Sequence, residues 1–325
     1  MRHLCALVFE PGFFASAQVQ SAAVIGATVA AVSAVTGVFT VVRGQSFSGH
    51  ALTDVSTAGG SGALLAGMSP VTGFVGLSII AAGMMEATRA QKARGRDLAT
   101  GIVLGAAIGL GALFLYLDTT AGATTGATQK ILFGSIFSLS SGIVPLVAAF
   151  SAIALGGIVL VYRPLLLATV STDMAAARGV PVRLAGTVYM MVLAVSVGLS
   201  SLAIGSILST ALLIGPAAAA LRITKRTGWA VVIAVMTGIG ATWLGVLLAY
   251  DSYYWGSAHQ GLPVSFFIVA LVLAAYLLSG LAATRTATVP RETAGPGPQR
   301  SRPVTDHGRQ AAGGHGKDKE CSPVS

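Results

Sequence analysis

The sequence predicts an all-α, polytopic membrane protein, and its composition and the spacing of its charges carry this prediction. Hydrophobic residues make up 54% of the 325 residues and charged residues only 10%, whereas soluble domains carry about 25% charged residues. Long intervals without any charged residue recur along the chain, and a spanning helix requires about 20 apolar residues. We therefore expect about eight to nine transmembrane helices in the cell membrane, as in a multi-pass protein of the bacterial plasma membrane.

The charge-free intervals divide into nine expected spans. The interval 184–221 is long enough for two of them, and we expect a tight turn between them near Ser200 and Ser201. The nine spans are 20–42, 47–66, 70–88, 98–117, 140–162, 184–200, 203–221, 229–250 and 263–283.

Most basic residues fall in segments that would face the cytoplasm. If the segment 89–97 is cytoplasmic, alternation of the spans places eighteen of the twenty lysines and arginines on that side and leaves Arg2 and Lys130 outside. Membrane proteins show this bias towards basic cytoplasmic loops. The net charge of +9 therefore indicates membrane topology, and we expect no nucleic-acid partner.

Two segments outside the spans have a distinct composition. Residues 119–141 begin with small polar residues and continue with ILFGSIF, which is too short to span. We expect an outer loop and a short helix that dips into the protein and returns. Residues 285–325 are rich in Pro, Gly, Arg and Lys, which predicts a disordered, basic cytoplasmic tail. The expected organisation is a transmembrane domain, 1–284, followed by this tail.

The stretch from Arg43 to Pro70 lies between two apolar segments, yet it contains a histidine, an aspartate and many serines, threonines and glycines. Side chains three or four residues apart lie on one face of a helix. The spacings of four, three and four relate His50, Asp54, Thr57 and Ser61. The stretch therefore predicts a spanning helix with a polar stripe.

Asp54 is the one carboxylate that these spans place within a helix rather than at its end. A charged side chain there costs at least about 2.5–3.5 kcal/mol, which a partner, a water-filled path or a bound cation has to offset. His50 lies one turn earlier, and an imidazole nitrogen with a carboxylate oxygen suits borderline divalent ions such as zinc, manganese or iron. The alternative is that His50 and Asp54 pair with each other and only fix helix packing.

The segment 162–183 is the longest expected cytoplasmic loop. Its residues Asp173 to Ala177 are good helix formers and begin with an acid, which favours a short helix. Gly179 stops this helix and Pro181 bars its return. A short helix held outside the membrane by two spans suits docking of another protein, and the alternative is a solvated connector.

Several passages resemble the membrane subunit of metal-ion ABC importers, the permease family for zinc, manganese or iron. FTVVRGQSFSGHALTDVSTAGG is similar to the family's FVVLRR-x-S-x-x-GDALSHA-x-LPG, and QKILFGSIFSLS is similar to its LFG-x-I-L-x-V-S element. STDMAAARGVPVRLAG and SLAIGSILSTALLIGPAAAALRI resemble its coupling segment, D-x-E-x-A-x-A-x-G-V-x-V-x, and the helix that follows. The passages keep the family's order and, with the intervals between them, cover most of residues 20–250.

The resemblance implies the fold of a type II ABC importer permease, which is not itself an enzyme and has no catalytic residue or cofactor of its own. It implies that two copies form a homodimer around a central path for the transported divalent metal ion. It also implies an ABC ATPase subunit, which binds the ATP, and an extracytoplasmic metal-binding protein that delivers the ion.

The resemblance also implies roles for particular residues. His50 and Asp54 correspond to the family's residues in the path, with the two residue types exchanged, and Thr57 and Ser61 are further candidates on the same face. The residues that correspond to the ATPase coupling segment are Asp173, Ala176, Arg178 and Gly179.

Three other functions stay open from the residues alone. A siderophore or cobalamin permease would share the fold but needs a wide path and no ion-sized ligand pair. A secondary, proton-coupled transporter would use Asp54 as its proton site and would transport without an ATPase. A membrane scaffold would tolerate the loss of both His50 and Asp54.

Overall fold

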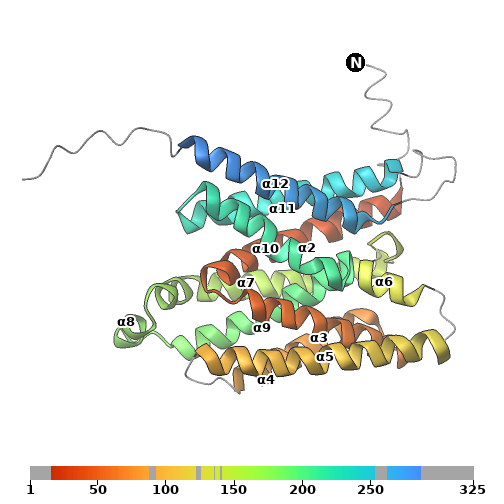
Figure 1. Cartoon of the computed structure of the whole chain (residues 1–325), viewed down its shortest axis with the longest axis horizontal. Helices are drawn as coiled ribbons and strands as arrows, with labels where there is room; N and C mark the ends of the chain where they lie inside the picture. The colour runs from red at the N-terminus through yellow and green to blue at the C-terminus, as the bar shows by residue number, and fades with distance from the viewer. Residues whose placement is uncertain are drawn as a thin grey trace, which may run out of the picture. The chain divides into compact units, whose positions relative to one another are not determined.

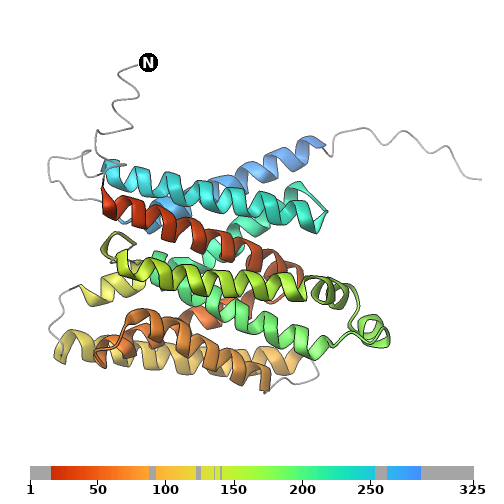
Figure 2. The ribbon, with the colours of Figure 1, turned by 180° about the vertical axis from the view of Figure 1, so that it is seen from behind.

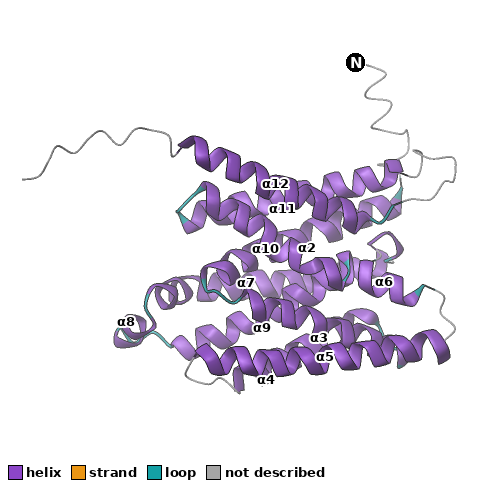
Figure 3. Ribbon diagram, in the orientation of Figure 1, coloured by secondary structure: helices purple, strands orange, loops and turns teal. Residues whose placement is uncertain are grey.

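The computed structural model describes residues 16–87, 93–121, 126–134, 136–139, 141–252 and 262–286. Every regular element in these ranges is helical (Figure 3). The long helices are α2 (Ala17–Val42), α3 (Ser46–Leu65), α4 (Pro70–Ala87), α5 (Ala93–Ala121), α7 (Val144–Val170), α9 (Val182–Ile204), α10 (Ser206–Ile223), α11 (Thr227–Ser252) and α12 (Val264–Thr286). The short elements are α6 (Ala127–Phe133), α8 (Thr172–Ala177) and the 3-10 helices η2 (Ile136–Ser138) and η3 (Ser141–Ile143).

Contacts divide the chain into residues 1–287 and 288–325. The described residues all belong to the first unit. α12 extends to Thr286, so it includes the first two positions of the predicted tail, 285–325. The rest of that tail lies outside the described residues.

Consecutive long helices run in opposite directions through the bundle (Figures 1 and 2). The α2–α3 and α10–α11 junctions lie at the same end as α8, and α6 lies at the opposite end (Figure 1). Arg178, Lys225 and Arg226 therefore belong to the α8 end, whereas Lys130 belongs to the α6 end. The charge pattern predicts this separation of a cytoplasmic end from an outer end.

Eight of the described helices are long and apolar enough to cross a membrane, which confirms the predicted polytopic fold. The long helix α3 is not one of these eight, because it contains His50, Asp54 and many small polar residues. Its 20 residues are about 30 Å long, and it packs against α4, α5, α9 and α10. We interpret α3 as a ninth span whose serine and threonine side chains at Thr53, Ser56, Thr57 and Ser61 are covered by neighbouring helices.

The bundle is most tightly packed around α9. In this helix 83% of the apolar stretch is buried, compared with 17% in α5. Leu193 and Leu199 of α9 are fully buried, whereas Leu113 of α5 and Leu277 of α12 are exposed. α3 packs against both α9 and α5. One side of α3 therefore faces the buried helix α9, and the other side faces the peripheral helix α5.

The boundary between α9 and α10 lies at Gly205, so the predicted turn near Ser200 and Ser201 is wrong. Both serines lie inside α9 and are fully buried, because their hydroxyl groups find partners on other helices. Gly205 has a φ angle of +95°, which residues other than glycine rarely adopt. A helix break at this position therefore needs glycine and not serine.

The short helix predicted within 119–141 corresponds to α6, which lies against the α9–α10 break. A Cβ atom at Gly205 would lie 2.3 Å from the carbonyl oxygen of Leu132. A Cβ atom at Gly134, whose φ angle is +76°, would lie 2.4 Å from the carbonyl carbon of Ile204. The turn at Gly134, after α6, and the turn at Gly205, between α9 and α10, thus pack with their backbones in contact. This contact holds α6 beside the start of α10.

The predicted loop 162–183 is shorter than expected because α7 continues to Val170. Arg163 and Pro164 lie inside this helix. The predicted helix Asp173–Ala177 is present as α8. Its N-cap is Ser171, whose hydroxyl oxygen accepts the N–H of Met174 at 3.2 Å, as Ser commonly does at this position.

Candidate functional site

The polar stripe of α3 becomes more buried along the helix. The side chains of His50 and Asp54 are 52% and 26% exposed, Thr57 is 8% exposed and Ser61 is fully buried. The hydroxyl group of Ser61 donates to carbonyl oxygens of its own helix, those of Thr57 and Ala58. The exposed part of the stripe thus consists of His50 and Asp54, whereas the hydroxyl group of Thr57 donates to the carbonyl oxygen of Thr53 in its own helix.

Asp54 and Thr57 line a cleft of about 210 Å³ between α3, α5, α6 and α10. Asp54 is the ionisable group in its lining, and most other lining residues are apolar. They are Ala107, Ile108, Gly111, Ala112 and Leu115 of α5, Leu132 of α6, and Ser206 and Ile207 of α10. A carboxylate in this setting favours a cation as ligand.

Nε2 of His50 and Oδ2 of Asp54 are too far apart for a direct hydrogen bond, but close enough for one ion to contact both. Nε2 of His50 lies 3.9 Å from Oδ2 of Asp54. A hydrogen bond would span about 2.7–3.2 Å, whereas two metal–ligand bonds of about 2.1 Å can span up to roughly 4.2 Å. The other ring nitrogen, Nδ1, lies 3.3 Å from Oγ1 of Thr210 in α10.

A group of hydroxyl residues joins α3 to α9 and α10, and we call it the cleft cluster. Its members are Thr53 and Ser56 of α3, Ser201 of α9, and Ser209 and Thr210 of α10. The oxygen–oxygen distances along it are 2.7 Å for Ser56–Ser201, 3.3 Å for Ser201–Ser209, 3.4 Å for Ser209–Thr53 and 3.3 Å for Thr53–Thr210. The cluster therefore connects buried Ser56 to His50.

None of these five residues was predicted as a site residue. The available signal was the recurrence of Ser206, Ser209 and Thr210 at helical spacing in an otherwise apolar span. Side chains at this spacing lie on one helix face, but the spacing does not say which helix that face meets.

Within the described part of the chain, no three His, Cys, Asp or Glu residues come together to hold a metal ion. His50 and Asp54 thus have no third residue of these types beside them, whereas structural zinc sites have four ligands.

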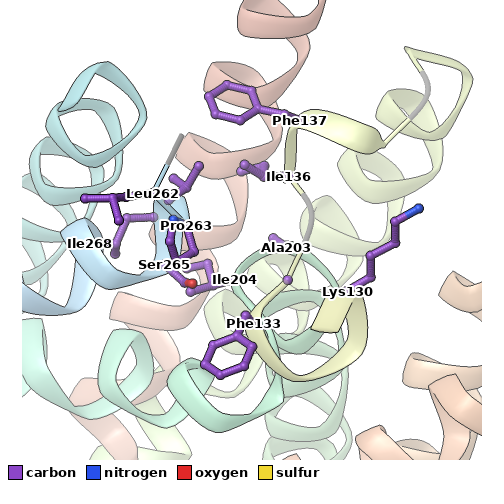
Figure 4. A pocket seen from close by; sticks show the side chains of 12 residues that line it. Lys130, Phe133, Ile136, Phe137, Ala203, Ile204, Leu262, Pro263, Ser265 and Ile268 are labelled. Atoms are coloured by element: carbon purple, nitrogen blue, oxygen red, sulfur yellow. The ribbon is translucent and has the colours of Figure 1, made fainter. Parts of the chain in front are cut away.

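A second cavity, of about 240 Å³, lies where α6 and η2 meet the α9–α10 break and the start of α12 (Figure 4). Its lining is mostly apolar, with Phe133, Phe137, Ile204 and Ile268 among the residues. The charged residue in its lining is Lys130, a cation. This lining does not suit a metal ion, so the cleft at Asp54 is the candidate site.

The predicted coupling residues belong to α8 and the turn after it. Ala176, Arg178 and Gly179 are exposed, and Gly179 has a φ angle of +74°. Asp173 lies in α8, and its side chain is outside the described residues. Ala175 is fully buried, which anchors α8 beside α7 and α9 and leaves the other face of α8 open.

A bundle of apolar helices with one polar stripe that opens on a cleft is the architecture of a multi-pass membrane permease. The chain belongs to the ABC 3 transport family, whose sequence profile matches residues 16–283. This membership confirms the predicted resemblance to the metal-ion ABC permeases and the location in the membrane.

Curated relatives include membrane proteins named for manganese and zinc. The chain is 29% identical over 234 residues to the manganese transport system membrane protein MntC of Halalkalibacterium halodurans, which covers 71% of this chain and 79% of the relative. It is 24% identical over 238 residues to the high-affinity zinc uptake system membrane protein ZnuB of Haemophilus influenzae. This match covers 70% of this chain and 87% of the relative.

Two solved structures share the fold. PsaBC from Streptococcus pneumoniae in complex with Fab matches with a TM-score of 0.72 at 22% identity and covers 86% of this chain and 96% of that chain. An inward-facing putative metal-chelate type ABC transporter matches with a TM-score of 0.62 at 15% identity and covers 87% and 95%. The predicted type II importer permease fold is therefore confirmed.

Proposed function

We propose that this chain is the membrane-spanning subunit of an ATP-driven importer for divalent metal ions, manganese or zinc. The observation that carries this proposal is the cleft that contains Asp54, with the imidazole of His50 3.9 Å from its carboxylate. An imidazole nitrogen and a carboxylate oxygen suit both of these ions. The names of the relatives, which refer to manganese and zinc, agree with this choice.

The size of the cleft favours an ion over a chelate. Its volume is about 210 Å³, whereas pockets for drug-sized molecules usually hold about 300–1,000 Å³. A siderophore or a cobalamin is larger than such a molecule. An importer for bare or partly hydrated ions therefore fits the cleft better than an importer for chelates.

A homodimer would complete the ligand set. The His50 side chain is 52% exposed in the single chain, so a second copy has access to it. Two His50/Asp54 pairs that face each other would supply four ligands, the number that a tetrahedral zinc site requires. In this proposal the path of the ion runs along the seam between the two copies.

Partners would bind at the two ends of the bundle. The open face of α8, with Ala176, Arg178 and Gly179, would receive the ATPase subunit that binds and hydrolyses ATP. The opposite end, where α6 lies (Figure 1), would receive the extracytoplasmic metal-binding protein. The chain itself would then need no cofactor of its own.

Uptake by reconstituted vesicles tests this function. The full chain is inserted together with a co-expressed ABC ATPase subunit, and ATP-dependent uptake of radioactive manganese and zinc is measured. Asp54→Asn removes the charge and keeps the shape, so we expect uptake to fall by more than about 100-fold, above the 10–100-fold usual for groups that only support a ligand. His50→Gln should lower uptake in the same way.

Thr36→Val is the matched control, because among the described residues the hydroxyl group of Thr36 bonds to Val32 of its own helix and to no other helix. Its uptake should equal that of the unchanged chain. Normal uptake by Asp54→Asn would overturn the assignment of the site. Metal uptake by the chain without any ATPase would overturn the ATP-driven mechanism and indicate a secondary transporter.

A further inference from the structure

The hydroxyl group of Thr210 connects His50 to the cleft cluster. Its Oγ1 lies 3.3 Å from Nδ1 of His50 and 3.3 Å from Oγ1 of Thr53. The hydroxyl group of Thr53 donates to the carbonyl oxygen of Gly49 at 3.1 Å. Thr210 has no such bond to its own helix among the described residues, so its single proton is available to a neighbouring helix.

The direction of these bonds follows from the number of protons. A threonine hydroxyl has one proton and two acceptor lone pairs. Because the hydroxyl group of Thr53 donates its one proton to the carbonyl oxygen of Gly49, Thr53 can only be the acceptor in its bond with Thr210. Thr210 then faces Nδ1 of His50 with a lone pair, and Nδ1 must carry a proton to complete the bond.

This arrangement determines which ring nitrogen of His50 is free. A neutral imidazole carries one proton, so a proton on Nδ1 leaves a lone pair on Nε2. Nε2 is the nitrogen that lies 3.9 Å from Oδ2 of Asp54. The lone pair that can bind a cation is thus on the nitrogen beside the carboxylate.

We propose that Thr210 is a positioning residue that holds His50 in the Nδ1–H tautomer, with Nε2 free to bind a divalent cation together with Asp54. This inference rests on the proposed function, since it assigns the support of the same ligand pair. Metal-binding histidines commonly donate their second ring N–H to an acceptor, and loss of that acceptor usually costs 10–100-fold in metal affinity. In this chain the acceptor would be a threonine on α10, 160 residues away in sequence.

The bond to Thr210 would also restrict the orientation of the exposed imidazole. The side chain of His50 is half exposed, and a surface histidine ordinarily samples several rotamers. Thr210 is itself half-buried and bonds to Thr53. This bond would limit the rotation of the Thr210 side chain and so fix the position of its hydroxyl oxygen. The buried end of the cleft cluster thereby orients a ligand at its open end.

Nitrogen-15 NMR of the full chain in lipid, labelled at its five histidines, tests the tautomer directly. The His50 signals are identified by their loss in His50→Gln. We expect a protonated Nδ1 and an unprotonated Nε2 in the unchanged chain. In Thr210→Val the Nε2–H form should become the major one, and Thr210→Ser should restore the original pattern.

Titration with zinc chloride on the same samples tests the consequence. In Thr210→Val the zinc concentration that gives half of the shift of the His50 signals should rise by 10–100-fold. In Thr210→Ser this concentration should stay within about threefold of that for the unchanged chain. In manganese uptake, Thr210→Val should raise the KM and leave the maximal rate nearly unchanged, whereas Thr210→Ser should resemble the unchanged chain. Thr36→Val controls for the loss of any buried hydroxyl group.

The two proposals fail in different ways. If Thr210→Val keeps the tautomer and the zinc affinity while Asp54→Asn abolishes uptake, Thr210 has no positioning role and the proposed function stands. If Asp54→Asn keeps normal uptake, the metal site assigned to Asp54 is wrong, whatever the tautomer. If the unchanged chain with an ATPase subunit shows no ATP-dependent metal uptake, the proposed function is wrong. If Thr210→Val does not fold, Thr210→Ala replaces it, and an unchanged His50 tautomer in that variant also overturns the inference.

Discussion

Two clusters of buried hydroxyl groups meet at α9, and they differ in where they end. The first, which we call the closed cluster, consists of Ser33 of α2 with Ser196 and Ser200 of α9. Its oxygen–oxygen distances are 2.6 Å for Ser33–Ser200 and 3.5 Å for Ser196–Ser33, and all three residues are fully buried. The cleft cluster, by contrast, leads through Thr210 to the exposed side chain of His50.

The difference teaches that polar residues in a span do not by themselves indicate a transport path. Ser200 and Ser201 are neighbours in α9, equally buried, and each bonds to a serine of another helix. Among the bonds of the described residues, those of Ser201 continue to the ionisable side chain of His50, and those of Ser200 do not. The function of a buried hydroxyl group therefore depends on what lies at the far end of its hydrogen-bond network.

The largest expected effect is a loss of folding when Gly37 is replaced. Gly37 lies in α2, as Ser33 of the closed cluster does, at the point where α2 packs against α10. A Cβ atom at Gly37 would lie 1.8 Å from the carbonyl oxygen of Leu213, so Gly37→Val has to force the two helices apart. We expect no folded protein by size-exclusion chromatography in detergent. Gly240→Val is the control, since a Cβ atom there would meet no atom within 4 Å. A folded and stable Gly37→Val variant would contradict the close approach of α2 and α10.

The second comparison replaces the two neighbouring serines in turn. Ser200→Ala and Ser201→Ala should each lower the free energy of unfolding by about 0.6–1.7 kcal/mol, the range of hydrogen bonds between membrane helices. Their effects on transport should differ. The KM for manganese uptake per folded molecule should stay unchanged in Ser200→Ala and rise by about threefold in Ser201→Ala, less than the effect of a direct partner of a ligand.

Thermal unfolding in detergent and uptake by vesicles measure the two quantities for both variants. Equal KM values in Ser200→Ala and Ser201→Ala would remove the functional distinction between the clusters. A raised KM in Ser200→Ala alone would reverse it.

The smallest expected effect concerns Ser61, a predicted candidate for the path. In the described part of the chain, its hydroxyl group donates to the carbonyl oxygens of Thr57 and Ala58, which belong to the same helix, and to no other group. Ser61→Ala should therefore change the free energy of unfolding by less than about 0.5 kcal/mol, and uptake by less than about twofold. A tenfold loss of uptake with normal stability would place Ser61 in the path.

Much of the fold was predictable because the signals are local. The length of an apolar segment and the placement of its flanking charges decide whether and in which direction a helix crosses, and neither depends on distant residues. The helix Asp173–Ala177 was predictable for the same reason, from its helix formers and Gly179. The stripe of His50 and Asp54 followed from helical spacing alone.

The positions that could not be predicted depend on contacts between distant segments. Ser200 and Ser201 looked like turn residues because small polar residues favour turns, yet hydroxyl groups on α2 and α3 keep them helical. Gly205, where the break lies, allows α6 to touch the start of α10. No local pattern contains either partner.

The sequence by itself determined that this chain crosses the membrane many times, and that one crossing carries an imidazole and a carboxylate on the same face. Only the tertiary structure decided that this face opens on a cleft beside α5 and that Thr210 meets His50. Apolar length and helical spacing are properties of a single helix. The rotation of one helix against another is set by close packing of side chains far apart in the chain, and this rotation selects which hydroxyl group reaches which ligand.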